Sequence, residues 1–89
     1  MNTKLDPKKE KLTGETNLKE LVLWDDQPGN LEFRISTLMN VCKISENEST
    51  NIVLDCLLDG CAKITTGRHD SLILMQEAFQ KELIKTTIE

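Results

Sequence analysis

Apolar and polar positions alternate most clearly from Leu31 to Ser36. The apolar members are Leu31, Phe33 and Ile35, and the polar members are Glu32, Arg34 and Ser36. A period of two is typical of a half-buried β-strand. A second apolar run, from Leu18 to Trp24, precedes it across the turn signal Pro28-Gly29. The two runs predict either a hairpin within one chain or a strand that pairs with a second chain.

After Ser36 the apolar positions follow helical spacing. Leu38, Val41 and Cys42 predict a short helix capped by Ser36 or Thr37, with a strand from Val41 to Ile44 as the alternative. The next segment begins at a run of capping residues, in which Ser45 with Glu48 fits a capping box and Ser49 or Thr50 could also cap. Its apolar stripe comprises Val53, Cys56, Leu57, Cys61 and Ile64. This pattern predicts an amphipathic helix that ends at Gly67.

A last helix is predicted after Asp70, which can act as its N-cap. Its apolar positions are Leu72, Met75, Phe79 and Leu83. The sequence therefore predicts an α+β fold, in which a short strand or hairpin is followed by two to three helices. Residues 1–17 are predicted to form a flexible Lys-rich arm, and residues 18–89 a single small α+β domain.

The charge distribution separates the two parts of the chain. Residues 1–19 hold five lysines against three acids, a net charge of +2, whereas residues 20–89 hold six basic against twelve acidic residues, a net charge of −6. No apolar run approaches the roughly 18 residues of a membrane-spanning helix, and the N-terminus lacks the apolar stretch of a secretory signal. We therefore expect a cytoplasmic protein without a membrane partner. The scarcity of aromatic residues favours a homo-oligomer.

The residues capable of chemistry do not fall into a recognisable catalytic or metal-binding pattern. Cys42, Cys56, Cys61 and His69 are the candidate zinc ligands, but they are spaced unlike the close pairs of most zinc sites. Carboxylate pairs such as Asp55 with Asp59 lack the apolar surroundings of an acid catalyst, so we expect a solvated surface there. The sequence predicts no enzyme, metal, cofactor, disulfide or small-molecule substrate.

The order of a strand, a short helix, a Ser/Asn-rich turn and an amphipathic helix over residues 30–64 resembles the ribbon-helix-helix DNA-binding family. In that family two protomers pair their strands into a ribbon that enters the major groove. The resemblance implies a homodimeric transcriptional regulator in which Asn30, Glu32 and Arg34 face DNA and the alternating apolar residues face the dimer core. It further implies a phosphate contact at the helix start formed by Ser49, Thr50 and Asn51. The Lys-rich arm would add phosphate contacts.

Two other functions remain open on the sequence. The first alternative is an acidic protein-binding module, an adaptor or inhibitor, in which a hairpin from Leu21 to Ile35 packs on the later helices. Its binding residues would be Asp25, Asp26, Glu32, Glu46 and Glu48, which suit a basic surface of a partner protein. The second is a structural oligomerisation subunit that associates through the last helix.

Overall fold

The structure of the chain, a computed structural model, describes residues 17–25 and 30–89. The elements follow in the order β1 (Leu18–Trp24), α1 (Leu31–Cys42), α2 (Glu46–Asp59), β2 (Cys61–Arg68), α3 (His69–Lys81) and β3 (Thr86–Ile88). The predicted α+β class is confirmed. Apart from Asn17, the predicted arm lies outside the described residues, and so do Asp26 and the Pro28-Gly29 turn signal.

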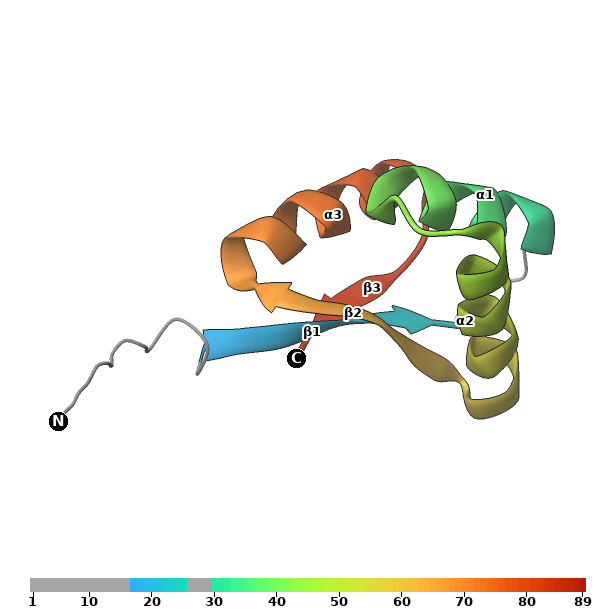
Figure 1. Cartoon of the computed structure of the whole chain (residues 1–89), viewed down its shortest axis with the longest axis horizontal. Helices are drawn as coiled ribbons and strands as arrows, with labels where there is room; N and C mark the ends of the chain where they lie inside the picture. The colour runs from blue at the N-terminus through green and yellow to red at the C-terminus, as the bar shows by residue number, and fades with distance from the viewer. Residues whose placement is uncertain (1–16, 26–29) are drawn as a thin grey trace, which may run out of the picture.

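The three strands form one antiparallel sheet in the order β2-β1-β3 (Figure 1). The predicted strand from Leu18 to Trp24 is confirmed, and as β1 it occupies the centre of the sheet. Its pairing with β2 runs from Leu18 opposite Arg68 to Trp24 opposite Cys61, with an irregularity between Leu21 and Val22. Central β1 is therefore held on both sides by segments far downstream in the sequence.

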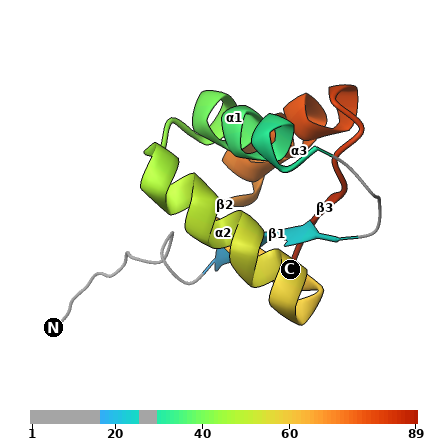
Figure 2. The ribbon, with the colours of Figure 1, turned by 90° about the vertical axis from the view of Figure 1, so that its right-hand side faces the viewer.

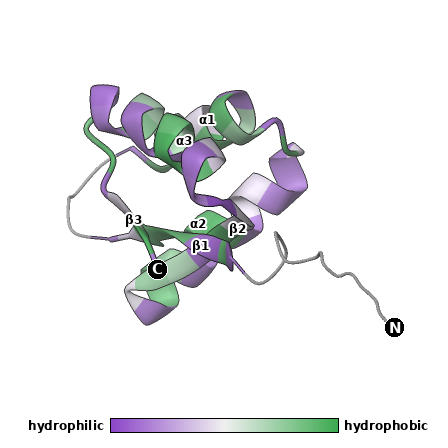
Figure 3. Cartoon of the chain, turned by 90° about the vertical axis from the view of Figure 1, so that its left-hand side faces the viewer, coloured by the Kyte–Doolittle hydropathy of each residue, from purple (hydrophilic) through white to green (hydrophobic). Residues whose placement is uncertain are grey.

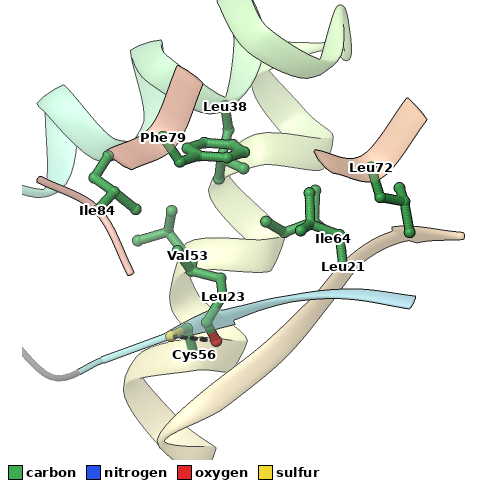
Figure 4. Close-up of a cluster of buried hydrophobic side chains, with 9 residues drawn as sticks. All are labelled: Leu21, Leu23, Leu38, Val53, Cys56, Ile64, Leu72, Phe79 and Ile84. Atoms are coloured by element: carbon green, nitrogen blue, oxygen red, sulfur yellow. Dashed lines mark hydrogen bonds between the residues drawn. The ribbon is translucent and has the colours of Figure 1, made fainter. Parts of the chain in front are cut away.

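The helices bury their apolar faces against one side of this sheet. Helices α1 and α3 lie above the sheet in Figure 1, whereas α2 runs past β1 and ends beyond it; Figure 2 shows the same arrangement end-on. Hydrophilic and hydrophobic segments alternate along the helices, as expected for partly buried helices (Figure 3). The core that they enclose is shown in Figure 4 and consists of Leu21, Leu23, Leu38, Val53, Cys56, Ile64, Leu72, Phe79 and Ile84.

The predicted strand at residues 31–36 is wrong, because these residues form the first half of α1. Asn30 caps this helix: its Oδ1 accepts hydrogen bonds from the backbone N–H of Glu32 at 2.8 Å and of Phe33 at 3.3 Å. The buried positions of α1 are Arg34, Thr37 and Leu38, which follow helical spacing. Phe33, expected on an inward strand face, is 46% exposed. The hairpin to Ile35 and the alternative strand from Val41 to Ile44 are wrong for the same reason.

The predicted second helix begins as expected but ends earlier. Ser45 is the N-cap of α2, and its Oγ accepts a hydrogen bond from the backbone N–H of Glu48 at 3.1 Å. The helix stops at Gly60 and not at Gly67, because Gly60 takes the left-handed conformation at φ +87° and donates its N–H to the Cys56 carbonyl at 2.8 Å. Cys61 and Ile64, expected on the helix, lie in β2.

The last predicted helix is confirmed as α3, although both of its ends differ from expectation. Asp70 lies in the first turn and not at the cap, which is Arg68. The helix ends at Lys81, so Leu83, expected on its apolar stripe, lies outside it and is 76% exposed. The chain then turns back to form β3, which the sequence pattern did not predict, and Ile84 joins the core.

Candidate functional site

The C-terminal end of β1 is the point where the sheet, α1 and α2 meet. The backbone N–H of Asp25 donates to the Gly60 carbonyl at 3.0 Å, which ties this end of the strand to the end of α2. The Asp25 carboxylate oxygen Oδ1 accepts a hydrogen bond from the Arg34 guanidinium nitrogen Nη1 at 3.1 Å, which ties it to α1. The Arg34 side chain is 8% exposed and that of Asp25 is 29% exposed. Arg34 thus holds a carboxylate that solvent can still reach.

Burial of a guanidinium is costly unless its charge is compensated, and the ion pair with Asp25 offsets part of that cost for Arg34. Asp25 directly follows β1, and Arg34 lies in α1, nine residues later in the sequence, so the ion pair joins these two elements. The ion pair therefore depends on the relative placement of the two elements. It also orients the Asp25 carboxylate at the protein surface.

The Cys56 thiol is buried in the core, close enough to this ion pair to be affected by both of its charges. Its Sγ donates to the Leu23 carbonyl at 3.5 Å (Figure 4). Burial raises the pKa of Cys56 above its usual value, and the negative charge of Asp25 raises it further, while Arg34 acts in the opposite direction. The thiol is therefore held in its neutral form and packs as a small apolar side chain.

An exposed apolar face of α2 adjoins the same end of the helix. Leu54, Leu57 and Leu58 are 47%, 42% and 82% exposed, and their three- and four-residue steps place them on one side of the helix. Leu57 lies in the turn whose Cys56 carbonyl accepts the bond from Gly60. We call Asp25, Arg34, Cys56, Leu57 and Gly60 the Asp25 corner. The fixed Asp25 carboxylate and the partly exposed Leu57 both lie at the C-terminal end of α2, and this combination suits a cationic group that carries an apolar neighbour.

The residues expected to contact DNA do not form a common surface. Asn30 uses its side chain to cap α1, and Arg34 is buried. Ser49 is fully buried within α2, Thr50 is half-buried and Asn51 is exposed. No residue of the expected ribbon is in a strand, because residues 31–36 are helical. An intersubunit ribbon cannot form from this segment.

The predicted acidic surface is also divided. Glu32 lies in the first turn of α1, whereas Glu46 and Glu48 lie in the first turn of α2. Helix α2 separates its first turn from Gly60 by about 20 Å. Asp26 lies outside the described residues. Of this set, only Asp25 belongs to the Asp25 corner.

Among the described residues, no three His, Cys, Asp or Glu side chains are grouped so that they could hold a metal ion. The candidate ligands Cys42, Cys56 and Cys61 are free thiols in three different environments. Within the same part of the chain, no helix has the length and apolar character needed to cross a membrane.

The stability of the protein is expected to fall as the pH rises from about 9 to about 11. Burial raises the pKa of Cys42 from 9.0 to about 11, so the neutral thiol is the form that the folded state favours. The contribution of Cys42 to the stability of the folded state is complete below the pKa of this thiol in the unfolded chain, and it is lost as the pH rises through its pKa in the folded protein. Thermal melts followed by circular dichroism should show a shallower decline for Cys42→Ala. Identical declines in the two proteins would contradict the expectation.

Three residues of the Asp25 corner were absent from the predicted DNA-binding and protein-binding sets. Cys56 was considered as a candidate zinc ligand and as part of the apolar stripe of its helix, Leu57 only as part of that stripe, and Gly60 had no predicted role. A signal for Leu57 was available in the sequence, because Leu54 and Leu58 on either side of it widen the apolar stripe beyond the face that a single sheet can cover. The apolar residues that the sheet cannot cover indicate an exposed apolar face on this helix.

Comparisons with known proteins find a structural likeness without a sequence family. No family model matches the chain, and no curated protein matches it. The arrangement of one three-stranded sheet and three helices is an α+β fold that occurs in a solved protein. That protein is Agrobacterium tumefaciens ClpS2, solved bound to L-phenylalaninamide, with a TM-score of 0.75 and 23% sequence identity. The match covers 82% of this chain and 95% of the ClpS2 chain.

This likeness shows the fold, and the fold itself corrects the functional expectation. The fold is built on an intramolecular sheet centred on β1, and the segment expected to form the DNA-reading strand is helical. The interpretation as a DNA-binding transcriptional regulator is therefore wrong.

Proposed function

We propose that this chain is a protein-binding module of the adaptor type whose ligand is the N-terminal residue of a partner polypeptide. The observation that carries the proposal is the likeness to ClpS2 bound to L-phenylalaninamide. L-Phenylalaninamide has a free α-amino group, an aromatic side chain and an amide where a peptide bond would follow. It therefore has the chemistry of an N-terminal phenylalanine residue.

The Asp25 corner supports this proposal chemically. A protonated α-amino group requires a carboxylate or other acceptors, and the partly exposed Asp25 carboxylate supplies one. Arg34 holds that carboxylate in place, which lowers the entropic cost of binding. The exposed leucine face of α2 offers contact area to an apolar first side chain.

The proposal retains one part of the acidic-module hypothesis, namely a protein partner and the use of Asp25. It does not use Glu46 and Glu48, which lie at the other end of α2. The expected lack of catalytic activity and the expected homo-oligomer stay predictions.

Binding of a fluorescently labelled peptide with an N-terminal phenylalanine, measured by fluorescence anisotropy, tests the proposal. We expect a dissociation constant of tens of micromolar or tighter, about −6 kcal/mol. Acetylation of the α-amino group should weaken binding by about tenfold or more, because a neutral amide cannot pair with Asp25. A peptide that begins with glycine should also bind more weakly.

Leu57→Ser should weaken binding of the phenylalanine peptide, whereas the matched change Leu83→Ser, at a leucine that is 76% exposed outside α3, should leave it unchanged. Both changes replace exposed leucines, so neither is expected to unfold the protein. Equal binding of the acetylated and free peptides would overturn the proposal. So would equal effects of the two substitutions.

A further inference from the structure

The face of the sheet opposite the core forms an open groove of about 540 Å³. Leu21 and Leu23 point into the core, so their neighbours along β1 point to the opposite face. Because α2 ends beyond β1, its last turns form one wall of the groove (Figure 1). The lining comprises Glu20, Val22, Trp24, Asp55, Asp59, Cys61, Ala62, Lys63 and Glu89. None of these residues belongs to the Asp25 corner.

Two of the four acidic residues in this groove occupy directly opposite positions in the sheet. Glu20 and Glu89 exchange both backbone hydrogen bonds, at 2.9 and 2.8 Å, so they are direct cross-strand partners. Like charges in directly opposite positions of an antiparallel pair destabilise the sheet. A cationic group bound between these two residues would therefore be favourable.

The other two acidic residues of the groove form a second pair of like charges, on α2. Asp55 and Asp59 are four residues apart on one helix face, where like charges repel. Asp59 is also the last residue of α2, beside the negative end of the helix dipole, and the last turn contains no basic residue. Lys63 is the single base in the lining, so the groove carries a formal charge of −3.

The aromatic part of the groove is fixed by hydrogen bonds. The Trp24 indole nitrogen Nε1 donates to Thr87 Oγ1 at 2.7 Å, and Thr87 Oγ1 donates to Glu89 Oε2 at 2.9 Å. This chain of bonds orients the indole ring together with the Glu89 carboxylate. The Lys85 ammonium, which does not line the groove, lies 5.9 Å from the ring centroid. An aromatic ring beside carboxylates is the arrangement that recognises guanidinium and ammonium groups.

We propose that this groove is a second docking site, which binds an extended segment of a partner protein that contains arginine or lysine residues. Charge complementarity identifies the occupant, because cationic side chains would relieve the repulsion in both carboxylate pairs. Glu20 and Trp24 are four residues apart on β1, which corresponds to about 13 Å. Basic residues about four positions apart in an extended segment therefore match the two ends of the groove. The proposal does not depend on N-terminal recognition at the Asp25 corner.

The test uses a fluorescent nine-residue peptide with two arginines four positions apart, acetylated at its N-terminus so that the Asp25 corner cannot bind its α-amino group. The full chain should bind this peptide at low ionic strength, about 50 mM, where charge attraction is weakly screened. Glu20→Gln combined with Glu89→Gln should weaken binding about tenfold. Glu46→Gln combined with Glu48→Gln makes the same change in net charge at the far end of α2 and should alter binding by less than about twofold.

Thermal melts of the same variants separate docking from folding. Removal of the Glu20 and Glu89 charges should raise the melting temperature, because it removes a cross-strand repulsion. Removal of the Glu46 and Glu48 charges should lower it, because acids in the first turn stabilise a helix. Equal weakening of peptide binding in both variants would show non-specific charge attraction and overturn the proposal. Absence of binding to the unmodified protein would also overturn it.

Discussion

Replacing Phe79 by alanine is expected to lower the free energy of unfolding by about 4 kcal/mol. Phe79 is fully buried and is the largest of the fully buried side chains. Its ring lies in the core with Leu38 and Ile84 (Figure 4), so its removal leaves a cavity that these neighbours would have to fill. Urea unfolding followed by circular dichroism measures the loss.

Phe33→Ala provides the matched control, since it deletes the same side chain from a position that is 46% exposed. We expect a loss of less than about 1 kcal/mol there. The contrast also tests the assignment of residues 31–36 to a helix. If this segment were a strand with Phe33 directed inward, the two substitutions would have similar effects, and that result would contradict the structure.

The ambiguity at Leu31 to Ser36 arises because this segment alternates like a strand, while the helical face that begins within it is completed only by the residues that follow. Leu31, Phe33 and Ile35 alternate like a strand, while Arg34, Thr37 and Leu38 form a helical face. The helical pattern includes an arginine, so it is missed when only apolar residues are considered. The N-cap at Asn30 was the decisive local signal, because its side chain satisfies two of the first free N–H groups of α1.

The short strands were harder to predict because their partners are distant. In β2 the helical spacing of Cys61 and Ile64 continues from α2 by coincidence, although Gly60 offered a stop signal and the run from Ile64 to Thr66 is β-branched. Strand β3 contains three residues, and its pairing of Ile88 with Leu21 depends on contacts across most of the chain. Such a strand forms only when the rest of the sheet is in place.

The site was predictable in its parts and not in its assembly. The sequence singled out Asp25 for protein binding and Arg34 for DNA binding, two rival hypotheses, whereas the structure joins them in one ion pair. Their pairing depends on α1 turning its first buried residue toward the end of β1. Local pattern carries no information on that orientation, because it is set by packing between elements.

Asp25→Asn is expected to lower the free energy of unfolding by about 2 kcal/mol, because it leaves the buried Arg34 charge without this carboxylate. We expect a smaller loss of stability than for a fully buried ion pair, since 29% of the Asp25 side chain is exposed. Arg34→Met should cost less, because methionine fills much of the same volume without a charge to compensate. Urea unfolding of both variants and of the double variant gives the coupling energy.

The double variant should be no less stable than Asp25→Asn alone, which corresponds to a coupling of about 1 to 2 kcal/mol. Additive losses would show that the two side chains act independently, and Arg34 would then have no positioning role. The same variants connect stability with binding. In Arg34→Met the Asp25 carboxylate remains, but the guanidinium no longer holds it in place. If this variant is folded and binds the N-terminal phenylalanine peptide more weakly, then Arg34 orients the Asp25 carboxylate for binding.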